Sequence, residues 1–210
     1  EISACLVGSE MCIRDSAFDT EQSLQVLRTG KRAGLGMRLH AAQLNPSSII
    51  ADAVELGVAS IDHCTFLSDT DVSAIADSHT VATVLPAAEF STRQPYPDAS
   101  RLLRAGATVA LATDCNPGTA FTSSMPFCLA VAVREMSMTP EQALWSATAG
   151  GAAALHRGDV GVVRPGTRAD LMSVAAPSWL HLFYRPGVPL ISQVWRRGVC
   201  HQMGAAPLPF

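Results

Sequence analysis

Short apolar runs alternate with amphipathic stretches along most of the chain. The runs have the length and β-branched content of buried strands, whereas the stretches between them repeat apolar residues three and four positions apart, as helices do. This pattern predicts strands over residues 36–40, 58–63, 80–86 and 108–114, and helices over residues 21–34, 46–57, 69–78 and 98–105. Pro46 is expected in the first turn of its helix and Gly57 just beyond the last turn. Strands that alternate with helices predict a parallel sheet with right-handed crossovers.

The pattern changes in the last third of the chain. Two apolar helices are expected over residues 123–137 and 139–155, the second opened by Thr139 as a cap and Pro140 at the first helical position. From Gly158 onward turn residues become frequent, and residues 168–174 and 190–199 are predicted to be strands. We therefore expect an α/β fold: part of a (β/α)8 TIM-like barrel over residues 17–157, strands of a small β-sandwich subdomain over 158–203, and a tail over 204–210. A doubly wound sheet is the alternative, but the sequence has no Gly-rich phosphate loop.

The first sixteen residues, EISACLVGSEMCIRDS, have neither helical nor strand periodicity. They also lack the basic start and apolar run of a signal peptide, and they resemble a translated sequencing-adaptor segment. We expect residues 1–16 to be non-native and to carry no function. The hypothesis that follows is that the chain from about Ala17 onward is the carboxyl-terminal part of a longer enzyme.

Composition narrows the classes of protein that remain. Hydrophobic residues make up 48% of the chain and charged residues only 16%, which suits a parallel sheet buried on both faces. The net charge is −3 and the sequence has no basic stripe, so we expect no nucleic-acid partner. No run approaches the roughly 18 apolar residues of a spanning helix, so we expect no membrane partner. The six cysteines form no CxxC pair, which favours reduced thiols in a cytoplasmic enzyme.

Polar side chains come at the ends of three of the four predicted parallel strands. His40 ends the first, His63 ends the second and Asp114 ends the fourth. Because the carboxyl ends of barrel strands carry the chemistry, these side chains are candidates for catalysis or metal binding. The alternatives are structural: Asp114 as a helix cap or turn residue, and each histidine as a hydrogen-bonded core residue.

A divalent metal held by imidazole and carboxylate groups lowers the pKa of its bound water and creates a hydroxide nucleophile. His40 and Asp114 suit that role, and His63 is either a third ligand or a proton shuttle. Two ligands are too few for a catalytic zinc. Arg93 is a candidate to bind a substrate carboxylate, with a solvent-facing loop position as the alternative. Cys115 is expected to pack rather than react, and the remaining histidines are expected to be structural or on the surface: His79, His156, His181 and His201.

Four segments together resemble the imidazolonepropionase family of the amidohydrolase superfamily. They are the segments RLHAAQL (residues 38–44), SIDH (60–63), LATDCNPGT (111–119) and GTRADL (166–171). The string from Thr113 to Gly118 is the most specific of these, and the resemblance covers roughly Ala17 to Val199. It implies the carboxyl-terminal part of a TIM-like barrel. It also implies a cytoplasmic enzyme of histidine degradation that hydrolyses the ring of 4-imidazolone-5-propanoate to N-formimidoyl-L-glutamate.

The resemblance also implies roles for particular residues. His40 and Asp114 are expected to bind one zinc or iron ion (Zn²⁺ or Fe³⁺) per subunit, and Asp114 also to accept a proton from the attacking water. His63 is expected to polarise the carbonyl group or stabilise developing charge, and Gln43 to contact the imidazolone ring, where some members have Glu. Three further residues are expected to hold the substrate or product: Asn116, Gly118 and Thr119. A homodimer is the expected assembly.

The sequence departs from the family in having no His-x-His pair for the first barrel strand. The family's substrate-binding Arg, Tyr and His of the amino-terminal half are also without counterparts. We therefore expect the 210-residue chain alone to bind metal weakly, to turn over no substrate and to be unstable, since a half barrel exposes sheet edges and apolar surface. Two alternatives stay open: another amidohydrolase such as a nucleobase aminohydrolase, and a non-catalytic fragment that acts only as a scaffold.

Overall fold

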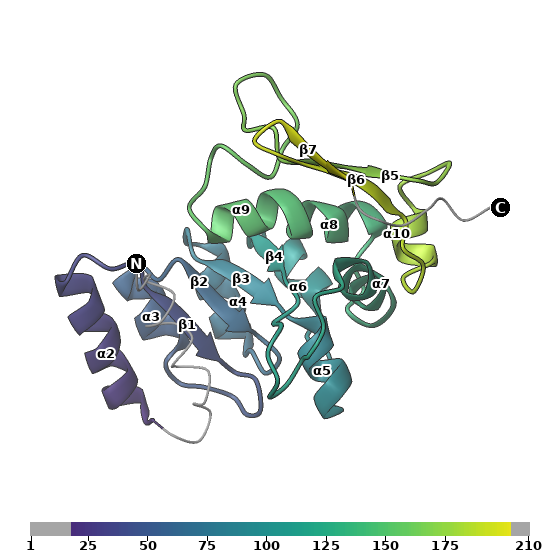
Figure 1. Cartoon of the computed structure of the whole chain (residues 1–210). Coiled ribbons are helices and arrows are strands. Elements are labelled where there is room, and N and C mark those ends of the chain that lie inside the picture. The colour runs from purple at the N-terminus through teal and green to yellow at the C-terminus, as the bar shows by residue number, and fades with distance from the viewer. Residues whose placement is uncertain (1–17, 203–210) are drawn as a thin grey trace.

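A four-stranded parallel sheet forms the centre of the computed structural model, which describes residues 18–202 (Figure 1). The sheet has the order β1-β2-β3-β4, so each strand lies beside its neighbours in sequence. Its strands are β1 (Arg38–Ala41), β2 (Ser60–His63), β3 (Val81–Val84) and β4 (Val109–Leu111), and the helices that precede or join them are α2 (Thr20–Arg32), α3 (Ile50–Leu56), α4 (Asp69–Ala76), α5 (Pro86–Thr92) and α6 (Ala99–Arg104). The predicted α/β fold with a parallel sheet is confirmed. The predictions for residues 1–16 and 204–210 lie outside the described residues.

Helix ends follow the capping residues that the sequence offers. Asp19 and Gln22 form a reciprocal capping box at the start of α2, and Gly57 closes α3 with a left-handed φ of 81°. The expected start of the second helix was wrong, since α3 begins at Ile50 and Pro46 lies in the preceding loop. The hydroxyl groups of Ser48 and Thr20 are 2.9 Å apart, and this contact ties the loop to the start of α2.

Two strands end earlier in the structure than the sequence predicts. The strand expected over 80–86 ends at Val84, because Pro86 occupies the first turn of α5, a helix that the sequence analysis did not predict. The strand expected over 108–114 ends at Leu111, and Asp114, three residues further on, has a left-handed φ of 52°. Asp114 therefore lies in the loop beyond β4 rather than in the strand.

The expected helices that follow the sheet are present as α7 (Met125–Glu135), α8 (Pro140–Trp145) and α9 (Gly151–Ala154). A π-helical turn over Ser146–Gly150 joins α8 to α9, so the long second helix is continuous but locally widened. This turn packs closely on β4, where a Cβ atom added to Gly150 would lie 2.2 Å from the carbonyl oxygen of Val109. Ala154 of α9 is buried in one cluster with Val81 and Ala110, which fixes the helix against β3 and β4.

A separate antiparallel sheet has the order β5-β6-β7. Its strands are β5 (Leu171–Val174), β6 (Ile191–Arg196) and β7 (Val199–Gln202), with the short helix α10 (His181–Tyr184) between the first two. The strand expected over 190–199 is in fact two strands, since Arg197 and Gly198 have φ values of 52° and 79° and form a tight hairpin turn. The boundary of a subdomain at residue 158 stays a prediction.

The main core lies between the parallel sheet and its helices. Its largest fully buried side chains are apolar residues from both layers, including Leu27, Leu39, Ile50, Ile61 and Ile75. Within residues 18–202 no helix is both long and apolar enough to cross a membrane. The packed core holds the strands in place, and the ends of these strands carry polar side chains.

Candidate active site

Strained backbone marks the carboxyl ends of the strands. Four residues other than glycine at or just after these ends have positive φ angles: Ala42 (56°), His63 (78°), Cys64 (60°) and Asp114 (52°). Such conformations are uncommon for residues with a Cβ atom and gather where surrounding structure enforces them, as at functional sites. The strained positions coincide with the ends of β1, β2 and β4, the ends that the sequence analysis selected.

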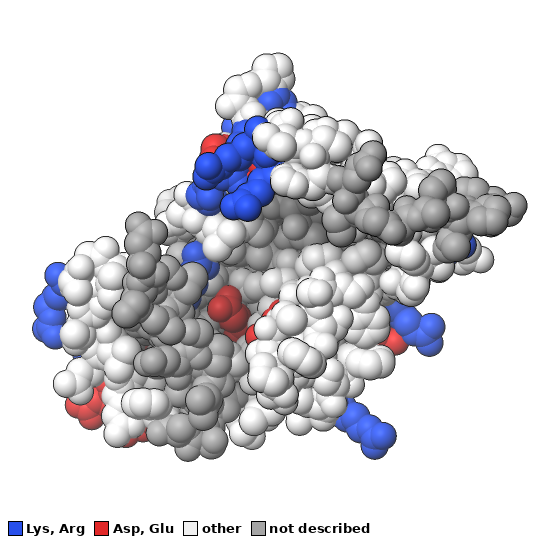
Figure 2. Space-filling model, viewed as in Figure 1, with Lys and Arg blue, Asp and Glu red and all other residues white. Residues whose placement is uncertain are grey.

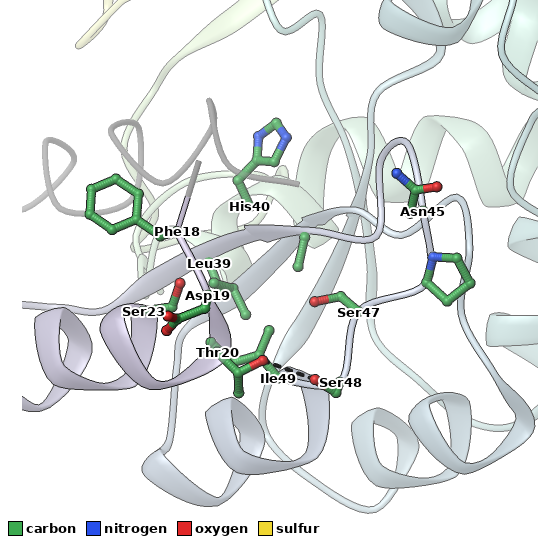
Figure 3. A pocket seen from close by; sticks show the side chains of 12 residues that line it. Phe18, Asp19, Thr20, Ser23, Leu39, His40, Asn45, Ser47, Ser48 and Ile49 are labelled. Carbon is green, nitrogen blue, oxygen red and sulfur yellow. Dashed lines mark hydrogen bonds between the residues drawn. The ribbon is translucent and has the colours of Figure 1, made fainter. Parts of the chain in front are cut away.

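His40 lies near the end of β1 and is buried. Its ring stands on one face of the strand, while the Thr20 and Ser48 side chains lie on the other (Figure 3). His40 Nε2 is 2.8 Å from Gln43 Oε1, which joins two residues that the sequence analysis assigned to the site. His40 also lines a cavity of about 240 Å³ between the start of α2 and the loop that follows β1.

His63 is fully buried and lies between His40 and Asp114. The ring centroids of His40 and His63 are 3.9 Å apart, and His63 Nε2 is 4.0 Å from Asp114 Oδ2. Three predicted site residues from three strand ends are therefore brought together. The two imidazole rings and the carboxylate can bind a polar ligand or exchange a proton.

The loop after Asp114 is closed by its own hydrogen bonds. Asn116 Oδ1 accepts hydrogen bonds from the backbone N–H groups of Gly118 (2.8 Å) and Thr119 (2.9 Å). The Thr119 hydroxyl donates to Asp114 Oδ2 at 3.0 Å, and Asn116 Nδ2 donates to the Asp114 carbonyl oxygen at 2.6 Å. The three residues expected to hold substrate thus lie in the turn that follows Asp114, and Thr119 is the one that contacts its carboxylate. The expectation that Cys115 packs was wrong, since this residue of the loop is exposed.

A polar row lies beside His40 on neighbouring strands. Arg38 pairs with Ser60 and His40 pairs with Asp62 in the parallel register of β1 and β2. Arg38 Nη1 donates to Ser60 Oγ at 3.1 Å, and Ser60 Oγ donates to Asp62 Oδ1 at 2.9 Å. Burial raises the pKa of Asp62, while its hydrogen bonds and the Arg38 charge act in the opposite direction. Figure 2 shows acidic side chains in a central hollow and basic side chains gathered over the antiparallel sheet.

Glu89 is a site residue that the sequence analysis missed. It lies in the first turn of α5, directly after β3, and only 1% of the residue is exposed. Its Oε1 atom is 3.6 Å from His63 Nδ1 and accepts a hydrogen bond from Thr65 Oγ1 at 2.9 Å. The signal was a single charged residue within the apolar segment 84–90 after a predicted strand. The third strand end thus also supplies a polar group, through its helix.

The side chains fit a bound metal in type but not in number. Imidazole nitrogen and carboxylate oxygen are ligands that zinc accepts, and His40 and Asp114 offer one of each. Across residues 18–202, however, no group of three or more His, Cys, Asp and Glu side chains is arranged to hold a metal ion. Since a catalytic zinc has three protein ligands or more, the described residues form at most part of such a site.

Acidic and imidazole side chains at the ends of parallel strands define the class of protein. Residues 15–200 match the amidohydrolase family, and the chain belongs to this family.

The similar curated proteins are imidazolonepropionases. The chain is 75% identical over 182 residues to the imidazolonepropionase of Cutibacterium acnes, 64% over 185 residues to that of Salinispora tropica and 63% over 183 residues to that of Streptomyces coelicolor. Each alignment covers 87% of this chain but only 46% or 47% of the relative. The chain thus spans about half the length of the curated relatives that it matches.

Solved structures resemble the fold at low sequence identity. An adenosine deaminase from Xanthomonas campestris with bound zinc has a TM-score of 0.65 at 20% identity, covering 88% of this chain and 49% of that protein. Atrazine chlorohydrolase from Arthrobacter aurescens TC1, solved with zinc, has a TM-score of 0.67 at 17% identity, covering 87% of this chain and 47% of that protein. These likenesses concern the fold, in which the chain corresponds to about half of a larger hydrolase.

Proposed function

We propose that the protein to which this chain belongs hydrolyses the cyclic amide C–N bond of 4-imidazolone-5-propanoate to N-formimidoyl-L-glutamate in histidine degradation. The observation that carries the proposal is the meeting of His40, His63 and Asp114 at the strand ends of a chain 75% identical to an imidazolonepropionase. A cytoplasmic location and a homodimer are part of the same proposal.

Hydrolysis adds water across the C–N bond, and the proposed roles follow from the contacts. Asp114 accepts a proton from water as the water oxygen bonds to the carbonyl carbon, and returns a proton to the ring nitrogen as the C–N bond breaks. His63, with Nε2 beside Asp114, faces the same space and stabilises charge on the carbonyl oxygen. The hydrogen bond from Thr119 fixes the carboxylate that moves the proton.

Gln43 and the loop after Asp114 are proposed to select the substrate. Gln43 is buried beside His40, at a position suited to contact the imidazolone ring. Asn116, Gly118 and Thr119 form the turn that follows Asp114, where a polar substrate group would approach the loop. Substrate binding by these residues requires exchange of hydrogen bonds that the loop now makes within itself.

His40 and Asp114 are proposed as two ligands of a zinc or iron ion, which when bound would lower the pKa of its water. The support is the type of the two donors and the approach of both to the His63 ring. Among residues 18–202 no third His, Cys, Asp or Glu side chain completes a group that could hold the ion. One ion per subunit is the expected content.

The test uses the 210-residue chain and a hybrid, in which the residues of this chain aligned with the Cutibacterium acnes imidazolonepropionase replace the matching segment of that enzyme. The hybrid is expected to consume imidazolonepropionate and to form formimidoylglutamate, whereas the 210-residue chain alone is expected to do neither. A well-folded hybrid without this activity, or one that instead deaminates adenine or cytosine, contradicts the proposal. Zinc and iron are measured in the same samples.

A further inference from the structure

We propose that Glu89 is a positioning residue for His63, holding the Nδ1 edge of the imidazole so that the Nε2 edge faces Asp114. The importance of this arrangement for turnover rests on the function proposed above. The arrangement itself is a property of the chain that can be tested without turnover.

The two carboxylates lie at opposite edges of one buried ring. Glu89 Oε1 is 3.6 Å from His63 Nδ1, and Asp114 Oδ2 is 4.0 Å from His63 Nε2. Both distances exceed a normal hydrogen bond, as is common in sites without substrate, where such bonds tighten on binding. The ring has two chemically different edges, so the carboxylate at Nδ1 determines what Nε2 can offer.

Glu89 is costly to bury, which argues against a purely structural role. Its neighbours on α5, Ala87 and Ala88, are fully buried and belong to an apolar cluster with Leu85. Glu89 Oε2 has no hydrogen-bond partner among the described residues. A buried ion pair commonly stabilises a fold no better than apolar residues of similar volume would. A carboxylate kept here therefore needs another reason, and the adjacent His63 ring supplies one.

The fold fixes Glu89 from both sides. Pro86 opens α5 immediately after β3, which sets the direction of the helix, and Thr65 Oγ1 donates to Glu89 Oε1 at 2.9 Å. Thr65 lies two residues after His63, in the loop that follows β2. The residue that donates a hydrogen bond to Glu89 and the ring that Glu89 faces therefore belong to one segment. A change in this loop would move the ring and its carboxylate together.

The test compares Glu89→Met, which removes the acceptor at similar volume, with Glu89→Gln, which keeps an acceptor oxygen. The first readout is the ¹⁵N spectrum of the His63 ring in the hybrid, assigned by its loss in His63→Asn. In the unsubstituted protein Nδ1 is expected to carry a hydrogen that faces Glu89. A hydrogen at Nε2 as well, which the proposed stabilisation of the carbonyl oxygen needs, requires the imidazolium form. Glu89→Met is expected to change the Nδ1 signal, and Glu89→Gln to retain it largely.

The second readout is turnover by the hybrid. Glu89→Met is expected to lower kcat by about 10- to 100-fold with KM changed less than about 2-fold, the size typical of losing a residue that orients a ligand of the site. Glu89→Gln is expected to recover part of kcat. The exposed Glu55 of α3 provides the control, and Glu55→Met is expected to change neither readout.

An unchanged His63 spectrum in Glu89→Met overturns the positioning role. If Glu89→Met does not fold, Glu89→Gln and a shortened Glu89→Asp are compared by the same spectrum, and identical His63 signals in all three proteins overturn it equally. A folded hybrid that is inactive before any substitution contradicts the proposed function alone, because its His63 spectrum still reports on Glu89.

Discussion

The imidazole ring of His40 lies against that of His63, with ring centroids 3.9 Å apart and ring planes tilted by 56°. The two residues belong to neighbouring parallel strands, but they are not paired in the register: His40 pairs with Asp62, and His63 pairs with Ala41. The positive φ of His63 lets its ring turn toward His40 at the end of β2. A strained backbone thus brings the two rings together.

Replacing His40 is expected to reduce metal binding. In the hybrid, His40→Ala removes an imidazole nitrogen, and loss of one protein ligand is expected to weaken zinc affinity by at least about tenfold. The measurement is zinc per subunit after dialysis against a graded series of chelator concentrations. His79→Ala is the matched control, because His79 is exposed in the turn before β3. Equal zinc retention by the two variants would rule out His40 as a ligand.

Thr119 is expected to support activity through its hydroxyl group. Thr119→Val removes the donor to Asp114 Oδ2 at nearly constant volume, whereas Thr119→Ser keeps it. Since a hydrogen bond to a charged group contributes about 1.5–3 kcal/mol, kcat/KM of the hybrid should fall about 10- to 100-fold in Thr119→Val. Thr119→Ser should stay within about threefold of the unsubstituted hybrid. A loss in Thr119→Ser but not in Thr119→Val would indicate that the methyl group, and not the hydroxyl, supports activity.

Much of the architecture could be predicted from the sequence because it depends on local patterns. Apolar runs separated by capped amphipathic segments specify the alternation of strands and helices, and Gly57 and the Thr139 capping box end and begin helices where expected. The missed helix α5 and the early end of β4 have a common cause. Each involves the backbone just past a strand, where tertiary contacts rather than side-chain periodicity decide the conformation.

The site was predictable in part for the same reason. His40, His63 and Asp114 stand out in the sequence as polar residues after apolar runs. Glu89 stands out only as a lone charge in the apolar segment 84–90, and its approach to His63 depends on the direction that α5 takes after β3. The hydrogen bonds that close the loop around Asp114 also depend on its left-handed backbone, which no pattern in the sequence specifies.

The exposed carboxyl group of Asp159 is expected to titrate at low pH because it pairs with Arg157. Arg157 donates two hydrogen bonds of 2.6 Å to Asp159, and this contact lowers the pKa of Asp159 from 3.8 to about 2. A folded-state pKa below the unfolded value stabilises the fold above about pH 4, and the contribution disappears as pH falls toward 2. Arg157→Gln should return the pKa of Asp159 toward 3.8 in an NMR titration.

The same substitution is expected to leave stability at neutral pH nearly unchanged, because solvent screens exposed pairs. Arg164→Gln is the control for removing an exposed guanidinium group outside this pair. An Asp159 pKa that stays near 2 in Arg157→Gln would show that another group depresses it.

The four cysteines of the described residues are expected to differ sharply in reactivity. Cys64 and Cys128 are buried, and burial raises the pKa of both thiols, that of Cys128 to about 11. Cys115 and Cys200 are exposed. Because the thiolate is the reactive form, iodoacetamide at pH 8 should modify Cys115 and Cys200 first, as measured by peptide mass spectrometry over time. Early modification of Cys64 would indicate that the end of β2 opens in solution.

Gly150 is expected to be essential for packing although it lies within a helical segment. Alanine normally stabilises a helix relative to glycine by about 0.5–1 kcal/mol. At Gly150, however, the added Cβ would lie 2.2 Å from the carbonyl oxygen of Val109, which belongs to the backbone of β4 and cannot turn aside. Overpacking costs about 1–3 kcal/mol and should outweigh the helical gain.

Gly151 provides the comparison between the cost of overpacking and the helical gain from alanine. At Gly151 the nearest atom to an added Cβ is the Ser146 carbonyl oxygen at 3.8 Å, an ordinary contact. Urea unfolding should therefore show a loss of stability for Gly150→Ala and a small gain for Gly151→Ala, measured on the same chain. Equal effects of the two substitutions would mean that the π-helical turn does not press on β4 in solution. The opposite signs, if found, establish that this turn holds the last strand of the sheet and, through it, the loop that carries Asp114.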